Sequence, residues 1–453
     1  MVRHRERPAC STSCSARPAY LWVLGGNTRA QAFYASKGFQ PDGARERHEE
    51  PRRVGDPDGA GVTRFLPLAD PSFDVTSAAV REARAESWYA ETPYGWAVLR
   101  HAEGSALLRD RRFRQGNARW PDQNGVHAGP FHAWWQEVLL SLEGDDHARL
   151  RRLLMPAFRN RTIAALRPRF QALADELVDG FALRGQVELI AEFAEPYAAR
   201  ILCVLLGLPE QDWAQVGHWA DDLGKSFGIR VKEDLPRIEA ALEGLYGYVE
   251  EVIDDRAARP RDDLVSTLLT AQEREGRLTR HELGVALVFL AFAGMETTRN
   301  QIGLAVQTLL AHPDQWRLLG ERPQLGGQAV EEVMRVNPTV TWVTREALED
   351  VDLHGLQIPR GGIVQVLSYA AGTDPLAVPY PAFDISEVRT PHLGFGAGAH
   401  HCLGHFVART DMAVALPLLA RRMPDAVPDG PGEWLPVSGN TGAVRFPIRF
   451  TPR

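Results

Sequence analysis

The chain contains few cysteines, no long apolar run and no surplus of positive charge. Four cysteines occur among 453 residues, and Cys10 and Cys14 are too isolated to build the disulfide framework of a secreted domain. The nearest candidate for a membrane span, residues 283–295, is shorter than the roughly 18 apolar residues required and runs into Glu296. Residues 1–18 are basic but lack the apolar core of a signal peptide. These absences predict a soluble, cytoplasmic protein with no membrane span.

The charge balance limits the kinds of binding partner that are expected. Acidic residues outnumber basic ones by 58 to 51, which gives a formal net charge of −7. This balance argues against nucleic acid or an anionic membrane as the main partner. With 44% hydrophobic and 24% charged residues, the composition is that of an ordinary globular protein.

One segment near the C-terminus, residues 392–404, has the composition of a metal site. It reads His-Leu-Gly-Phe-Gly-Ala-Gly-Ala-His-His-Cys-Leu-Gly. The glycines permit positive φ and let the backbone approach a flat partner closely. Cys402 stands where a helix is expected to begin, and the free N–H groups there favour a thiolate. With Phe395 upstream to shield the sulfur, the pattern predicts a haem-iron ligand. The alternative is a glycine-rich turn with a buried structural cysteine.

A second segment, residues 143–152, has two basic side chains at helical spacing. His147 and Arg151 are four residues apart and share one helix face, with Asp145 or Asp146 as the expected N-cap. Two such groups one turn apart can clamp a pair of carboxylates. A solvated basic face is the alternative interpretation.

Residues 283–312 predict a long buried helix, because the segment is apolar on nearly all sides. Gly294 weakens the helical hydrogen bonds and permits a local kink. Glu296 and Thr297 then place a carboxylate and a hydroxyl in a dry setting, which is costly unless they are hydrogen-bonded or used in chemistry. An acid beside an alcohol can relay protons into such a site. The alternative is a satisfied threonine with a glutamate facing a cleft.

These segments together resemble the cytochrome P450 family over residues 66–453. The family's Phe-Gly-x-Gly-x-His-x-Cys-x-Gly pattern is matched at Phe395, Gly396, Gly398, His400, Cys402 and Gly404. Its His-x-x-x-Arg, acid–threonine and Glu-x-x-Arg motifs follow the family's order at 147–151, 296–297 and 332–335. Residues 370–375, Ala-Ala-Gly-Thr-Asp-Pro, depart from the family's usual Ala-Asn-Arg-Asp-Pro.

The resemblance implies a mainly α fold with a smaller β part, in which haem b lies between the long helix and the Cys402 loop. The implied cofactor-binding residues are His147, Arg151, Arg345, His400 and Cys402, with Cys402 as the metal ligand. Arg345 is expected to end a strand over residues 339–343. The implied catalytic residues are Glu296 and Thr297.

The implied activity is monooxygenation, in which one oxygen atom of O₂ enters a small organic substrate. Because no reductase domain is appended, the family's usual electron donors, ferredoxin and ferredoxin reductase, are the expected partners. Arg109, Arg111, Arg112 and Arg114 are candidates for docking them. The alternatives are a haem-thiolate peroxygenase, coupling enzyme or dehydratase, and a non-catalytic haem sensor. An intact acid–threonine pair argues against these.

Two further segments are assigned to the substrate pocket by the resemblance. Residues 115–132 have no periodicity and predict a long loop, and loops of that length are usually functional. The corresponding loop covers the substrate in the family, so Trp120, Val126 and Phe131 are pocket candidates. Residues 213–236 are expected to roof the pocket.

Residues 1–65 differ from the rest. Tyr20 to Leu24 predict a short strand, and Asn27 is suited to cap a helix over residues 28–37. Residues 20–60 are similar to the last strand and helix of GNAT-type N-acetyltransferases, but the glycine-rich turn that binds acetyl-CoA is absent upstream. We therefore expect a non-functional remnant, joined through a charged linker over residues 44–61 to the haem domain at 66–453.

Overall fold

The computed structural model describes residues 2–6, 20–23, 39–45, 64–228, 230–275, 278–436 and 438–452. The chain divides into two units, Met1–Ala60 and Gly61–Arg453.

In the smaller unit the structure describes three antiparallel strands in the order β2-β1-β3: β1 (Val2–Glu6), β2 (Tyr20–Val23) and β3 (Phe39–Arg45). The strand predicted at residues 20–24 is therefore present. The helix predicted at 28–37 lies outside the described residues. Ala44 and Arg45 belong to β3, so the linker does not begin where the composition indicated.

The larger unit is mainly helical, as predicted. Its helices are α2 (Ala78–Glu86), α3 (His101–Leu107), α4 (Trp120–Gln123), α5 (Pro130–Glu137), α6 (Gly144–Leu154), α7 (Asn160–Asp179), α8 (Glu195–Leu206), α9 (Trp213–Gly224), α10 (Val231–Ala258), α11 (Leu264–Glu275), α12 (Arg280–Leu310), α13 (Pro313–Glu321), α14 (Gly326–Val336), α15 (Ser368–Gly372) and α16 (His405–Arg422).

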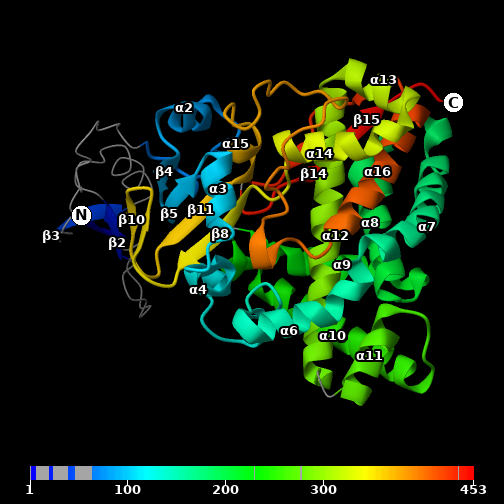
Figure 1. Cartoon of the computed structure of the whole chain (residues 1–453), viewed down its shortest axis with the longest axis horizontal. Coiled ribbons are helices and arrows are strands. Elements are labelled where there is room, and N and C mark those ends of the chain that lie inside the picture. Colours follow the sequence, from blue (N-terminus) through cyan, green and yellow to red (C-terminus); the bar gives the residue numbers. More distant parts are fainter. Residues whose placement is uncertain are drawn as a thin grey trace, which may run out of the picture. The chain divides into compact units, whose positions relative to one another are not determined.

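The β part of this unit is small. Its strands are β4 (Tyr89–Thr92), β5 (Gly95–Val98), β6 (Phe113–Gln115), β7 (Gln186–Glu188), β8 (Trp342–Ala347), β9 (Val351–Leu353), β10 (Leu356–Ile358), β11 (Ile363–Leu367), β12 (Val427–Pro428), β13 (Glu433–Trp434), β14 (Ala443–Arg445) and β15 (Pro447–Arg449). They form sheets in the orders β4-β5-β11-β8-β6, β12-β15-β7, β10-β9 and β13-β14. In Figure 1 the five-stranded sheet lies at one end of the unit and most helices at the other.

Helix α12 runs through the helical part, with α8, α9 and α16 packed beside it (Figure 1). A capping box starts it: Thr279 Oγ1 accepts a hydrogen bond from the Glu282 backbone N–H at 3.1 Å, and the Glu282 carboxylate accepts one from the Thr279 N–H at 2.8 Å. The helix is buried on nearly all sides and continues without a break through Gly294. No helix in the described part of the chain is long and apolar enough to cross a membrane.

A buried ion pair fixes the chain ahead of the Cys402 loop. Arg335 and Glu332 of α14 are 2.7 Å apart and each is 1% exposed. The Arg335 guanidinium also donates to the carbonyls of Gly372 and Pro381, at 3.1 and 3.0 Å. Since every donor of a buried guanidinium needs an acceptor, this pair ties α14 to two segments distant in sequence.

Three local predictions are wrong. Residues 115–132 are not one loop, because they contain α4 and the start of α5. The N-cap of α6 is Glu143 rather than Asp145 or Asp146, which lie in the first turn, where their charge favours the helix dipole. Arg345 does not end its strand but lies inside β8, where it pairs with Val364 of β11.

Candidate active site

The loop that carries Cys402 depends on glycine. Gly396 and Gly398 have φ of +66° and +73°, in the left-handed region that favours glycine. A Cβ at Gly398 would lie 2.5 Å from the Leu108 carbonyl oxygen, so a side chain is excluded there. The Cys402 backbone N–H donates to the Phe395 carbonyl at 2.9 Å and closes the loop. Helix α16 begins three residues beyond the cysteine.

The Cys402 thiol is a free cysteine whose surroundings act on its pKa in opposite directions. Burial raises the pKa and is the largest effect. The Gly404 backbone N–H and the guanidiniums of Arg151 and Arg409 lower it. The effect expected of the backbone N–H groups is therefore present, but burial outweighs it. A metal cation at the sulfur would reverse this, because a coordinating thiol is deprotonated.

Four basic residues from three elements meet at this loop. The His147 ring of α6 lies 4.1 Å from the His400 ring, centroid to centroid. Arg151, one turn further along α6, donates to the His401 carbonyl. Arg345 of β8 lies with Nη2 3.4 Å from the Ala397 carbonyl and also donates to the Gln115 side chain. The structure therefore brings together the predicted cofactor-binding residues of the loop, α6 and β8.

Negative charge is scarce within this cluster. Glu143 is the carboxylate in contact with it: its Oε1 lies 3.1 Å from His400 Nε2 and accepts from the Gln115 backbone N–H at 2.6 Å. Burial raises the pKa of Glu143, but these two donors outweigh burial and lower it. His147 Nε2 is buried and has no hydrogen-bond partner in the part of the chain that the structure describes. Burial lowers the pKa of His147 to about 4 and that of Arg345 to about 10.

The acid and the alcohol of α12 form a second group. Thr297 Oγ1 donates to the Ala293 carbonyl at 2.8 Å. Glu296 is 7% exposed; one of its oxygens accepts weakly from Asn300 Nδ2 at 3.4 Å, and Oε2 has no partner among the described residues. Burial raises the pKa of Glu296 to about 7, and the nearby Arg299 partly opposes the rise. A carboxyl with this pKa can both release and regain a proton near neutral pH.

A row of charged side chains leads from Glu296 to the surface. Arg299, buried beside it on α12, donates to Asp221 of α9. Lys225 lies 3.0 Å from Asp221 and 2.9 Å from Asp222. Arg237 of α10, whose side chain is 59% exposed, lies 2.7 Å from Asp222. This row was not predicted from the sequence, although a charged residue such as Arg299 inside an apolar helix is a signal that could have marked it.

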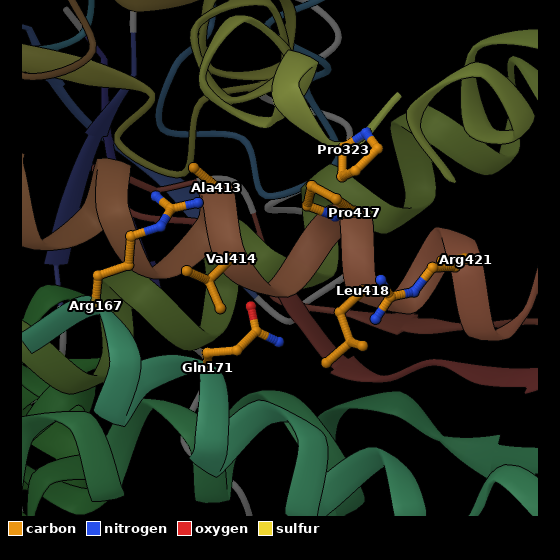
Figure 2. Close-up of a pocket in the computed structure, with 8 residues that line it drawn as sticks. All are labelled: Arg167, Gln171, Pro323, Ala413, Val414, Pro417, Leu418 and Arg421. Carbon is orange, nitrogen blue, oxygen red and sulfur yellow. The ribbon is translucent and has the colours of Figure 1, made fainter. Parts of the chain in front are cut away.

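Two cavities complete the description. One, of about 490 Å³, adjoins the Cys402 loop and is lined by His101, Ser105, Arg109, Pro391, His392, Leu393, Phe395, Gly396, Ala397, Gly398, His401 and Arg409. The other, of about 70 Å³, lies between α7 and α16 (Figure 2). None of the predicted site residues lines the smaller cavity.

Comparison with known proteins decides the family. A profile of the cytochrome P450 family matches residues 210–424. Luteothin monooxygenase of Streptomyces thioluteus is 35% identical over 390 residues, which cover 85% of this chain and 96% of the relative. Mycinamicin IV hydroxylase/epoxidase of Micromonospora griseorubida is 35% identical over 366 residues, covering 79% and 90%. This chain belongs to the cytochrome P450 family.

Solved structures agree with this assignment. The crystal structure of CalO2 superposes with a TM-score of 0.77 at 34% identity and covers 84% of this chain and all of that protein. P450BioI, solved with an acyl carrier protein bearing hexadec-9Z-enoic acid, gives 0.76 at 30% identity, covering 85% and 99%. The predicted P450 fold is confirmed. The comparisons give no support to the likeness between residues 20–60 and N-acetyltransferases.

The P450 is a monooxygenase that uses haem b and O₂ to oxidise an organic substrate. Its residues fit this cofactor. Haem carries two propionate carboxylates. Among the described residues, the cluster at the Cys402 loop offers two guanidiniums and two imidazoles against one carboxylate, and His147 Nε2 has no partner there. Charge-assisted hydrogen bonds from such donors are the strong ones for carboxylates.

Proposed function

We propose that Cys402 ligates the haem iron and that His147, Arg151, Arg345 and His400 hold the propionates. The convergence of these four side chains on residues 397–401 is the observation that carries the proposal. Each group can donate to a carboxylate, and burial keeps water from competing. A thiolate-ligated haem supplies the oxidising chemistry when bound, and the protein orients the substrate and delivers protons.

The proton path runs through Glu296 and Thr297. Forming one hydroxyl group and one water from O₂ consumes two protons and two electrons. Glu296 has a pKa near 7 and an oxygen without a partner among the described residues, so it can take up a proton that enters from the surface. Arg299 and Lys225 stay charged and hold Asp221 between Glu296 and the surface. The Thr297 hydroxyl, which donates to Ala293 at rest, turns to hand a proton to the reacting oxygen.

The test is reductant coupling in Thr297→Ala. This change removes the hydroxyl and leaves the helix and the thiol in place. Product per NADH consumed should fall on the order of 100-fold while NADH oxidation continues and releases H₂O₂. Unchanged coupling would mean that Thr297 is only a helix residue. The same assay separates monooxygenation from the peroxygenase alternative, which would make product from H₂O₂ without NADH.

Electrons come from ferredoxin, which is itself reduced by ferredoxin reductase. Ferredoxin docks at the cavity beside the Cys402 loop. This cavity is lined by Arg109 and Arg409; because Arg409 is paired with Glu331, Arg109 supplies the positive charge that suits an acidic protein. Of the arginines predicted from the sequence, Arg112 is paired with Asp110 and Arg114 with Glu346, and Arg109, unlike Arg111, lines the cavity.

The enzyme works in the cytoplasm, where reduced ferredoxin is available and where the cysteines of the enzyme stay as thiols.

The smaller unit has no part in this chemistry. The larger unit begins at Gly61, and Arg64 pairs with Glu82 and Glu86 of α2. A chain starting at Gly61 should therefore keep its haem and turnover. Loss of either on truncation, or binding of acetyl-CoA by the full chain, would overturn this proposal.

A further inference from the structure

Five aromatic rings from three segments pack together on the α5 side of α12. Phe131, Trp134 and Trp135 come from α5, Phe227 follows α9, and Phe292 belongs to α12. The Phe227 and Phe292 rings stack at 4.9 Å, and the Trp134 ring meets Phe292 edge-on at 6.0 Å. Phe131, Trp135 and Phe292 are fully buried, and Trp134 is 3% exposed.

The indole N–H of Trp134 lacks the kind of hydrogen bond that three other tryptophans make. Three other tryptophans donate to backbone carbonyls: Trp120 to Ser226 at 2.7 Å, Trp135 to Asn117 at 2.7 Å and Trp316 to Met423 at 2.8 Å. Trp134 Nε1 is buried and has no partner among the described residues. A buried donor without an acceptor is costly, and in native proteins a water, an ion or a ligand usually completes it.

A bound water is a poor explanation. A buried water needs two to four polar partners, and the ring contacts of Trp134 are with Phe131, Trp135 and Phe292. An anion is also disfavoured, since an apolar, aromatic setting offers it no compensation for its lost hydration. The ligand that suits this setting carries a neutral hydrogen-bond acceptor on an apolar skeleton, which packs against the edges and faces of the aromatic rings.

The position of this donor connects it with the reaction. Phe292 directly precedes Ala293, whose carbonyl accepts the Thr297 hydroxyl at 2.8 Å. A molecule that accepts a hydrogen bond from Trp134 beside Phe292 therefore lies within about one helical turn of the acid–alcohol pair along α12. The inference rests on the proposed function in taking this part of α12 as the substrate side.

We propose that Trp134 Nε1 donates a hydrogen bond to a carbonyl oxygen of the substrate, and that the substrate is a flat apolar molecule carrying that carbonyl. Trp134 is then a specificity-determining residue. The neighbouring rings select the flat body, and the indole N–H selects and orients the oxygen, because an analogue without it leaves the donor unpaired.

The test compares two isosteric probes, 2-acetylnaphthalene and 2-isopropenylnaphthalene, in which a CH₂ group replaces the carbonyl oxygen. Dissociation constants are measured by calorimetry with the haem-loaded wild type, Trp134→Phe and Trp135→Phe. The wild type should bind the ketone about 5- to 10-fold more tightly than the alkene. Trp134→Phe should bind both equally, and Trp135→Phe should keep the preference. Equal binding by the wild type, no binding of either probe, or a preference kept by Trp134→Phe would overturn the proposal.

Stability without ligand provides a second readout. Both replacements lose the same ring volume, but only Trp135→Phe breaks a hydrogen bond in the free protein, the one to Asn117. Trp134→Phe should therefore have the higher unfolding midpoint of the two. An equal or larger loss in Trp134→Phe would mean that its N–H is already satisfied, and the proposal would fail. Neither measurement uses turnover. A negative result for Trp134 therefore leaves the proposed role of Thr297 untouched, and a negative coupling result for Thr297→Ala leaves the binding and stability results for Trp134 valid.

Discussion

Gly224 of α9 lies directly against the Glu296 carboxylate of α12: a Cβ built on Gly224 would sit 2.6 Å from Glu296 Oε2. The absent side chain leaves room for the buried acid in the position that the structure shows. Because the clash would be with the end of a flexible side chain rather than with backbone, a methyl group there should move the carboxylate without unfolding the protein.

Gly224→Ala therefore tests whether the position of Glu296 matters. The displaced carboxyl should deliver protons poorly, so we expect product formation to fall about 10-fold while the haem content stays normal. The matched control is Gly247→Ala in α10, where a Cβ meets nothing within 4 Å. Equal turnover in both variants would show that Glu296 tolerates displacement and does not act from this site.

Glu296 should also make stability depend on pH. Its pKa is raised from 4.5 to about 7 in the folded protein, so its contribution to stability is full below about pH 4.5 and is lost as pH rises through about 7. Glu296→Gln has no carboxyl to ionise at this position, so its stability does not fall with pH for this reason. Between pH 5 and pH 8 the variant should therefore gain roughly 2 to 3 kcal/mol in unfolding free energy relative to the wild type.

Urea unfolding at a series of pH values measures this difference. The control is Glu321→Gln, which removes an exposed carboxylate at the end of α13. The wild type and Glu296→Gln would have parallel stability curves if the carboxyl were ionised in the folded protein throughout. That result would exclude Glu296 as a proton carrier near neutral pH.

The local parts of the site could be predicted from the sequence, and the long-range parts could not. His147 and Arg151 follow from i, i+4 spacing, and the Cys402 loop from its glycines. The pairing of Arg299 with Asp221 joins residues 78 apart in sequence, so no local pattern contains it. Arg345 was assigned through resemblance alone.

The local errors have a similar cause. Glycine and proline indicated a loop over residues 115–132, yet packing of aromatic side chains in the core stabilises α4 and α5 there. At Cys402 the effect of the backbone N–H groups on the pKa could be expected from the sequence, whereas the opposing effect of burial could not, because a sequence does not display burial.

Arg345→Ala should weaken haem binding, because it removes a charge-assisted donor from a cluster with few alternatives. We expect haem to dissociate on the order of 10- to 100-fold faster in transfer to apomyoglobin. Arg112→Ala is the control, since this arginine is exposed and paired with Asp110. Arg345→Lys should recover part of the loss. Unchanged dissociation in Arg345→Ala would remove Arg345 from the propionate site.

The ligand of the iron is the central claim, and one spectrum tests it most directly. The haem-loaded wild type and Cys402→Ser are reduced, exposed to carbon monoxide and compared in the Soret region. The wild type should show the red-shifted band of a thiolate-ligated ferrous–CO complex, and Cys402→Ser should bind haem and lack that band. A Cys402→Ser protein that retained the red-shifted band would contradict the assignment of Cys402 as the iron ligand.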